Sequence, residues 1–315
     1  MAGLHPQVEA LVGAAALQPT EDPDQLAAMR ADYVETAIRL GGALEAVDRV
    51  EDVVIGRGDG ADLRAPGLAA RAYWPKTVEP VGALVWLHGG GWCIGDLDGF
   101  DRVCRSLCNA ASATVVSADY RLAPEHRYPA AVEDADLAVA WATGHGAAQL
   151  GFDPARVAIG GDSAGGNLSA VASLHAKDAL RAQLLVYPVV DAGMDTGSYR
   201  EHGDFPLLTA EAVAFCWRTY VGGDDLARAG EPDASPLRAA DLSGAPPAYV
   251  AVAGHDVLHD EGIAYARALE AAGVPVTLRD FADMAHGFIR WGGVVDRTRE
   301  LVADLGAFAR ETLRA

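Results

Sequence analysis

A serine between small residues is the strongest chemical signal in this 315-residue chain. Ser163 is the centre of the sequence GDSAG at 161–165, which follows a short apolar stretch at 157–160 and precedes a helical pattern at 164–179. A serine on a tight strand-to-helix turn has strained backbone angles, so its neighbours must be small. Its hydroxyl would project at a helix N-terminus, where the dipole favours negative charge. This setting indicates a nucleophile rather than a serine that only caps a helix.

A glycine-rich loop offers the backbone donors that such a nucleophile needs. The sequence HGGGW at 88–92 follows the apolar stretch 83–88. Acyl transfer requires N–H groups aimed at the oxyanion, and glycines let the backbone come close enough. We expect donors from Gly90, Gly91 and Ala164, with Gly89 shaping the turn or adding a donor. A phosphate-binding loop is the rival interpretation, but no lysine follows and no Walker pattern is present.

The nucleophile also needs a base, and His286 has the right position for one. It is the last of nine histidines and stands in AHGF at 285–288, after the last predicted strand. Where a G-x-S-x-G serine lies on this kind of turn, the acid and then the histidine follow it along the chain. The sequence therefore predicts His286 as general base and acid.

The orienting acid should lie between the strand at 248–253 and the histidine. The segment 254–262 offers Asp256 and Asp260. Asp256 is nearer the strand end, from which its carboxylate could reach the histidine, whereas Asp260 is expected to begin the next helix as a cap. We favour Asp256 and keep Asp260 as the alternative.

The same segment allows a different class of site. His255 and Asp256 precede His259 and Asp260 by four residues, a spacing that could hold a metal on one helical turn. The segment is predicted to be a loop, and no third ligand cluster is apparent elsewhere. We therefore expect no metal and no other cofactor.

The elements that would position these residues alternate between short apolar runs and helical patterns. Continuous apolar runs indicate strands that are covered on both faces, hence a mostly parallel sheet in a layered α/β fold. Strands are predicted at 68–74, 83–88, 114–118, 157–160, 182–189, 248–253 and 276–281, and helices at 102–113, 131–143, 164–179, 261–272 and 296–313.

Two segments depart from this alternation. Residues 1–45 have apolar positions at helical spacing, and residues 191–235 form an aromatic-rich insertion between two strands. We interpret both as one small helical cap over the carboxyl ends of the strands, where open α/β sheets bind ligands. The catalytic core would then comprise 46–190 and 236–315. The alternative is that both segments merely cover a face of the sheet.

Charge and composition exclude several classes of partner. The formal net charge is −19, which disfavours binding to nucleic acid or to anionic membranes. Four cysteines without a CxxC pair indicate a reducing compartment. The N-terminal residues lack the basic start of a secretory signal, and no stretch is apolar enough to span a membrane. We expect a cytoplasmic protein.

Together these residues resemble the hormone-sensitive-lipase-like branch of the α/β-hydrolases, the microbial family IV esterases. The resemblance runs from about residue 50 to the end, and it includes the sequences HGGGW at 88–92, DYRLAPE at 119–125, YPAAVED at 128–134, GDSAGGN at 161–167, YP at 187–188, LLT at 207–209, and HGF at 286–288, together with the segment 256–262. One departure is Val257, where the family often has proline. It puts the shape of the loop in doubt, not the role of Asp256.

This resemblance implies an eight-stranded α/β-hydrolase core with a small cap. It implies Ser163 as nucleophile, His286 as base and Asp256 as orienting acid, with Gly90, Gly91 and Ala164 as oxyanion donors. It also allows a homodimer through the last strand and helix, as in similar esterases. The activity implied is hydrolysis of small-molecule carboxylic esters through an acyl-enzyme.

The aromatic residues of the insertion suggest an enclosed apolar acyl pocket and hence short- to medium-chain acyl groups. Amides and lactones share the same chemistry and stay open as substrates. The rival class is a non-catalytic ligand receptor, as in plant hormone receptors of similar fold that have lost the catalytic histidine. Because the serine, the acid and the histidine are all present here, we favour the enzyme.

Overall fold

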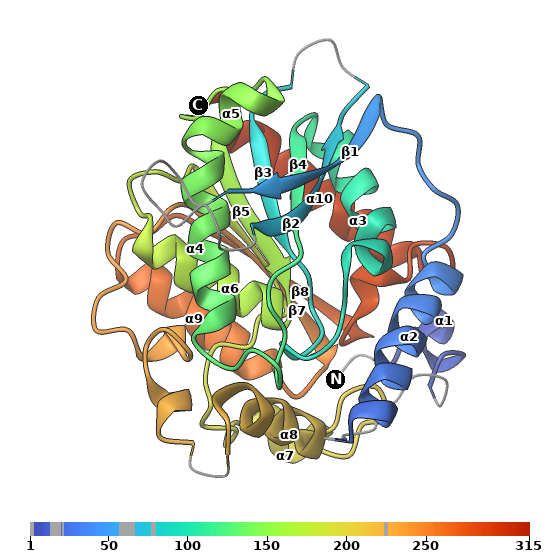
Figure 1. Ribbon diagram of the computed structural model, residues 1–315. Helices are drawn as coiled ribbons and strands as arrows, with labels where there is room; N and C mark the ends of the chain where they lie inside the picture. Colours follow the sequence, from blue (N-terminus) through green and yellow to red (C-terminus); the bar gives the residue numbers. More distant parts are fainter. Residues whose placement is uncertain (1–2, 13–19, 21, 57–66, 77–79, 224–225) are drawn as a thin grey trace.

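The computed structural model describes residues 3–12, 20, 22–56, 67–76, 80–223 and 226–315. Its centre is one eight-stranded sheet in the order β1-β2-β4-β3-β5-β6-β7-β8 (Figure 1). The strands are β1 (Arg49–Ile55), β2 (Leu68–Trp74), β3 (Ala83–Leu87), β4 (Thr114–Ala118), β5 (Val157–Asp162), β6 (Ala182–Val186), β7 (Ala248–His255) and β8 (Val276–Ala285).

The sheet is parallel from β4 to β8, whereas β1 and β2 are antiparallel to their neighbours. Every residue of β3, β4, β5 and β6 is buried, which explains why these strands are continuous apolar runs without alternation. The predicted eight-stranded, mostly parallel α/β-hydrolase sheet is confirmed.

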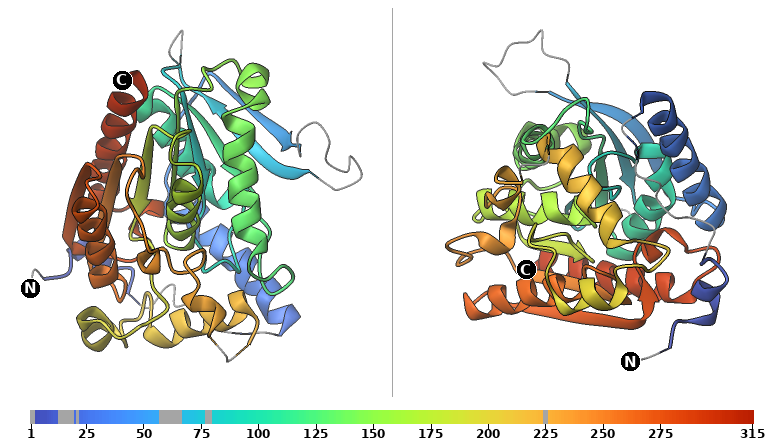
Figure 2. Two further views of the ribbon diagram at one scale, coloured as in Figure 1. Left: turned by 90° about the vertical axis from the view of Figure 1, so that its left-hand side faces the viewer. Right: turned by 90° about the horizontal axis from the view of Figure 1, so that it is seen from below.

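Helices cover both faces of the sheet (Figures 1 and 2). The helices α3 and α10 pack on each other and on one face, while α4, α6 and α9 pack on the other. The described helices are α1 (Pro6–Glu9), α2 (Pro23–Leu40), α3 (Leu97–Ala111), α4 (Ala130–Ala142), α5 (His145–Leu150), α6 (Ala164–His175), α7 (Gly197–His202), α8 (Ala210–Val221), α9 (His259–Ala271) and α10 (Asp296–Arg314), with short 3₁₀ turns η1 (Arg228–Gly230), η2 (Pro236–Arg238) and η3 (Phe288–Arg290). Across the described ranges, every helix is too short or too polar to cross a bilayer.

Most predicted strands and core helices are present within a few residues of their expected bounds, but β1 was not predicted. Its sequence RVEDVVI mixes charges with valines, and only Ile55 is fully buried. The strand forms because it pairs with β2 along its whole length at the edge of the sheet. A pattern based on burial cannot find a strand that is held mainly by backbone hydrogen bonds.

The segment after β7 also differs from expectation. A loop is predicted from 254 up to the helix expected at 261, yet β7 continues to His255 and α9 begins at His259. Only 256–258 lie between the two elements. The turn is this tight because the Asp256 carboxylate accepts the Leu258 N–H at 2.9 Å, which lets the helix begin at once.

Candidate active site

Ser163 lies on a sharp turn between β5 and α6, with φ 55° and ψ −119°. A non-glycine residue with positive φ is strained, and such strain is found mostly at functional sites. The turn is possible because Gly165 has no side chain: a Cβ there would lie 2.0 Å from the carbonyl oxygen of Leu87 in β3. The close approach of β3 and α6 leaves Ser163 8% exposed, at the carboxyl end of its strand.

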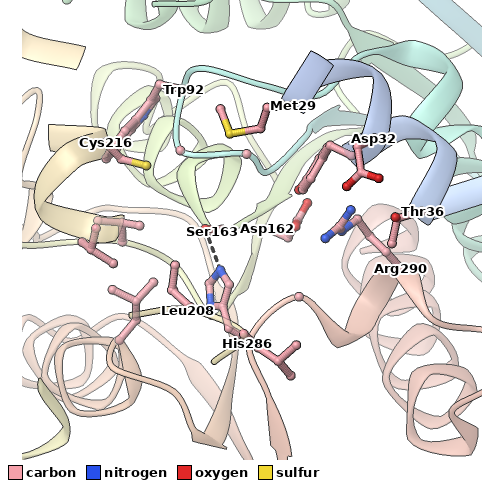
Figure 3. A pocket seen from close by; sticks show the side chains of 18 of the residues that line it. Met29, Asp32, Thr36, Trp92, Asp162, Ser163, Leu208, Cys216, His286 and Arg290 are labelled. Atoms are coloured by element: carbon pink, nitrogen blue, oxygen red, sulfur yellow. Dashed lines mark hydrogen bonds between the residues drawn. The ribbon is translucent and has the colours of Figure 1, made fainter. Parts of the chain in front are cut away.

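His286 and Asp256 complete a chain of hydrogen bonds with this serine. His286 Nε2 lies 2.9 Å from Ser163 Oγ, and His286 Nδ1 lies 2.7 Å from Asp256 Oδ2 (Figure 3). An ionised carboxylate can only accept, so Asp256 selects the tautomer with the proton on Nδ1. Nε2 is then free to accept the serine proton. The structure thus brings together three residues that lie up to 123 positions apart in sequence.

The glycine loop lies beside the serine, but its three glycines differ. Gly90 and Gly91 line the same pocket as Ser163, and no acceptor for either N–H is found among the described residues. A Cβ on Gly90, which has φ 133°, would lie 2.1 Å from the Ile94 carbonyl oxygen. The Gly89 N–H, in contrast, donates to Asp162 at 2.9 Å. Gly89 therefore shapes the turn, and its N–H is not available as an additional oxyanion donor.

His88 holds this glycine loop in place through a hydrogen bond and a ring contact. Its Nδ1 lies 2.9 Å from the Gly89 carbonyl oxygen, and its ring stacks on Tyr120 with centroids 4.3 Å apart. Complete burial lowers the pKa of His88 to about 4, so the ring is neutral at physiological pH. The Tyr120 hydroxyl donates to the His88 carbonyl oxygen at 2.7 Å. Tyr120 belongs to the DYRLAPE sequence, which thereby supports the loop.

Asp162 is a pocket residue that sequence reasoning did not single out. Its carboxyl is buried directly before the serine, and burial raises its pKa to about 6. The Arg290 charge, the Gly89 N–H and the His286 charge act in the opposite direction. Asp162 occupies the position before the serine in G-x-S-x-G, which can be any residue, so only the fold reveals that this aspartate holds the glycine loop in place.

The pocket has two unlike sides (Figure 3). Leu208 lies on one side of the Ser163–His286 pair, whereas Asp32, Thr36 and Arg290 lie on the other. The lining also includes the rings of Tyr33, Trp92 and Trp291 and these aliphatic or sulfur-containing side chains: Met29, Val189, Leu207, Val213, Cys216 and Leu258. The aromatic residues of the insertion that were expected to enclose this pocket (Tyr199, Phe205, Phe215, Trp217 and Tyr220) are not among its lining residues.

Two of those aromatic residues instead hold α8 on the glycine loop. Trp92 stacks on Tyr220 with ring centroids 4.3 Å apart and planes 3° from parallel, and it contacts Trp217 at 4.7 Å. All three side chains are buried. Trp217 and Tyr220 thus attach the insertion to the core and do not line the pocket at Ser163, whereas the enclosed apolar acyl pocket stays a prediction.

The alternative roles for the residues after β7 are not supported by their contacts. Asp260 is the second residue of α9 rather than its cap, and its carboxylate accepts the Ser198 N–H at 2.9 Å. His259 lies between Asp260 and Asp280, at 3.0 Å and 3.4 Å. Within the described ranges, no three His, Cys, Asp or Glu side chains come together as metal ligands would. Asp256 is the one that reaches His286.

A serine on a strand-to-helix turn, with a histidine and an aspartate from the following strands of a mostly parallel sheet, defines the chain as an α/β-hydrolase of the serine hydrolase class. A family model described as alpha/beta hydrolase fold matches residues 84–290. The chain belongs to this family, in the hormone-sensitive-lipase-like branch that its motifs resemble.

Known relatives agree with this assignment. The chain is 45% identical over 265 residues to the carboxylic ester hydrolase LipN of Mycobacterium tuberculosis, covering 79% of this chain and 70% of that protein. It is 35% identical to an ethyl acetate hydrolase of Pseudomonas putida, covering 86% and 85%. A hyperthermophilic esterase from the archaeon Pyrobaculum calidifontis has a similar structure, with a TM-score of 0.89 and 36% identity over the full length of both chains. The chain is an enzyme of the carboxylesterase class.

Proposed function

We propose that this enzyme hydrolyses short- to medium-chain carboxylic esters, with Ser163 as nucleophile, His286 as general base and acid, and Asp256 as orienting acid. The observation that carries the proposal is the continuous hydrogen-bond chain from the buried Asp256 through His286 to Ser163, at 2.7 Å and 2.9 Å. Two further features favour it: the strained serine backbone and the N–H groups of Gly90 and Gly91, which have no acceptor among the described residues.

In the acylation step, Ser163 Oγ attacks the ester carbonyl carbon while His286 Nε2 takes the hydroxyl proton. The carbonyl oxygen becomes an oxyanion, for which the N–H groups of Gly90, Gly91 and Ala164 are the proposed donors. Asp256 stabilises the imidazolium through Nδ1–H. The tetrahedral intermediate then collapses, the bond from the carbonyl carbon to the alkoxy oxygen breaks, and His286 gives its proton to the leaving alcohol.

In the deacylation step, water takes the place of the alcohol. His286 Nε2 accepts a proton from the water as its oxygen attacks the acyl carbon of the Ser163 ester. The same N–H donors stabilise the second oxyanion. Collapse breaks the bond to Oγ, returns the proton to Ser163 and releases the carboxylic acid. The six residues named for this cycle supply every proton transfer and every oxyanion contact.

The size and lining of the cavity support a preference for small acyl groups. Its volume is about 90 Å³, less than the roughly 150 Å³ of an apolar cavity that holds benzene. Aliphatic side chains such as Leu208 and Val213 form one side. The related Pseudomonas putida protein is named for a small ester, ethyl acetate.

We further propose that residues 1–45 and 191–235 form a cap over a catalytic core of 46–190 and 236–315. Helix α2 from the first segment and α8 from the second both contribute residues to the pocket at Ser163, and the aromatic stack of Trp92 on Tyr220 attaches the insertion to the loop. Residues 1–2, 13–19, 21 and 224–225 of the two segments lie outside the described residues.

The test is hydrolysis of p-nitrophenyl esters from acetyl to palmitoyl by the wild type, Ser163→Ala and Ser173→Ala. Ser173 is a matched control because it is a buried serine on the same helix, α6, whose hydroxyl has no partner among the described residues. We expect Ser163→Ala to lower kcat by about 10⁴-fold or more, with Ser173→Ala near wild type. Highest kcat/KM on palmitoyl esters would overturn the chain-length proposal.

One outcome would redirect the proposal. Equal, low turnover by the wild type and Ser163→Ala would contradict ester hydrolysis. Turnover of an anilide would then indicate an amidase, and turnover of a lactone a lactonase. Ligand binding without turnover would indicate a receptor.

A further inference from the structure

Arg290 is a pocket residue that the proposed catalytic cycle does not use. It ends η3, four residues after His286, and its guanidinium reaches the polar side of the pocket opposite Leu208 (Figure 3). The guanidinium carbon lies 3.8 Å from the centroid of the Tyr33 ring of α2. This stacking fixes the plane of the guanidinium and leaves its edge for hydrogen bonds.

Two nitrogen atoms of this guanidinium find no acceptor in the part of the chain that the structure describes. Its Nε and Nη1 atoms are buried, and neither has a hydrogen-bond partner among the described residues. Several other arginines in the described ranges are paired with carboxylates, as Arg71 is with Asp52 and Arg121 with Asp134. Buried donors are normally satisfied, so an unsatisfied pair in a ligand pocket indicates a group supplied by the ligand.

The charges around Arg290 indicate what kind of acceptor fits. The buried Asp162 carboxyl is close enough for the Arg290 charge to lower its pKa, against the larger effect of burial. Asp32, a second carboxylate, lies exposed at the same side of the pocket. A third carboxylate from a substrate would therefore be repelled. An uncharged oxygen could accept from the guanidinium without adding negative charge.

We propose that Arg290 is a specificity residue that selects esters with an uncharged oxygen acceptor, such as a ketone or an ether, in the substituent that faces α2. The inference rests on the proposed esterase function and names its substrate class. An ester has two substituents, one on each side of the carbonyl at Ser163. The aliphatic side of the pocket takes an alkyl group, and the side with Arg290 takes the oxygen-bearing one.

The experiment uses two pairs of substrates that differ by one oxygen. In the acyl pair, p-nitrophenyl 4-oxopentanoate is compared with p-nitrophenyl 4-methylpentanoate. In the alcohol pair, 2-methoxyethyl acetate is compared with butyl acetate. The measured quantity is the ratio of kcat/KM within each pair, after subtraction of spontaneous hydrolysis. The pair that shows the preference identifies which substituent faces α2.

The variants are Arg290→Met, Arg290→Lys and the control Arg299→Met, which makes the same change at an exposed arginine. We expect the wild type to favour the oxygen-bearing member of one pair by about tenfold or more. Arg290→Met should lose this preference while still hydrolysing the alkyl member. Arg290→Lys should restore part of the preference, and Arg299→Met should keep all of it.

Three results would overturn the inference. The first is a wild type without preference in either pair, a result that does not depend on the folding of any variant. The second is an unchanged ratio in Arg290→Met. The third is a higher kcat/KM for 3-acetoxypropanoate, which ends in a carboxylate, than for 2-methoxyethyl acetate, since that would indicate an anion site. Turnover of butyl acetate by the wild type keeps the esterase proposal intact in all three cases.

Discussion

Single residues explain why the loop beside Ser163 is shaped as it is. Asp162 is buried next to the nucleophile, where a carboxyl is unfavourable, yet its oxygen holds the Gly89 N–H at 2.9 Å. The aspartate therefore fixes the glycine loop while Gly90 and Gly91 face the pocket. Asp162 would therefore affect the position of the proposed oxyanion donors without contacting the substrate.

The raised pKa of Asp162 predicts a pH-dependent stability difference in Asp162→Asn. The folded-state pKa is about 6 and the ordinary value is 3.8. Between these values the folded state binds more protons, so the free energy of unfolding falls as pH rises. Asparagine keeps the acceptor but cannot ionise. We expect the variant to gain about 2 kcal/mol relative to wild type between pH 4 and pH 7.

Urea unfolding at the two pH values measures this difference. Asp178→Asn, at an exposed aspartate, is the control for general loss of a negative charge. A difference between wild type and Asp162→Asn that stays constant from pH 4 to pH 7 would contradict a buried, titrating Asp162.

The sequence predicts some residues of the site and misses others. Ser163 and His286 could be found because the fold requires them at fixed places relative to strands, and those strands are strongly apolar. The roles of Tyr33 and Arg290 could not be found, since the helical spacing that includes Tyr33 does not show what its ring contacts, and Arg290 belongs to no local pattern. Their contact joins α2 to a turn more than 250 residues later, and only the packing of α2 on the core creates it.

Among the elements, the insertion after β6 is attached to the core by a buried acid. Glu261, in the first turn of α9, accepts the Val190 N–H at 2.8 Å and the Asp191 N–H at 3.4 Å. Burial raises the pKa of this carboxyl well above its ordinary value. Burial therefore favours the uncharged form of this side chain, which holds the chain where the insertion begins.

A neutral acceptor at this point predicts different effects of two substitutions. Glu261→Gln keeps an uncharged oxygen in the same place and should change the free energy of unfolding little. Glu261→Ala leaves the buried Val190 N–H without an acceptor and should cost about 1–3 kcal/mol. Urea unfolding at pH 7 compares the two. Equal losses would show that the charge of Glu261, rather than its oxygen, holds the segment.

The elements were predictable to the extent that burial decides them. The runs at β3, β4 and β5 were evident because both faces are covered. The role of α8 was not, because the aromatic residues that suggested a pocket wall pack instead on Trp92. Periodicity shows that a helix has an apolar face, but not which surface that face will cover.

For the whole molecule, the homodimer allowed by the family resemblance stays a prediction, as does the cytoplasmic location. The strand β8 is at the edge of the sheet, and Leu278 on it is 37% exposed. If β8 pairs with that of a second copy, sedimentation should give twice the 32.8 kDa of one chain. Leu278→Pro should then shift the protein to monomer, because proline blocks strand pairing. A wild-type monomer at micromolar concentration would contradict the dimer.

The proposed ester hydrolysis requires that Ser163 Oγ is the atom that is acylated. Covalent labelling of this serine is therefore the most direct test. Ethyl 4-nitrophenyl methylphosphonate would lose nitrophenolate to the attacking serine and leave one phosphonyl group on the protein. Intact mass and peptide mapping locate that group, and residual esterase activity is followed in parallel. We predict one label per chain, on the peptide that contains Ser163, with activity lost in proportion and no label in Ser163→Ala. Stoichiometric labelling at another residue, or full ester hydrolysis by Ser163→Ala, would contradict the account.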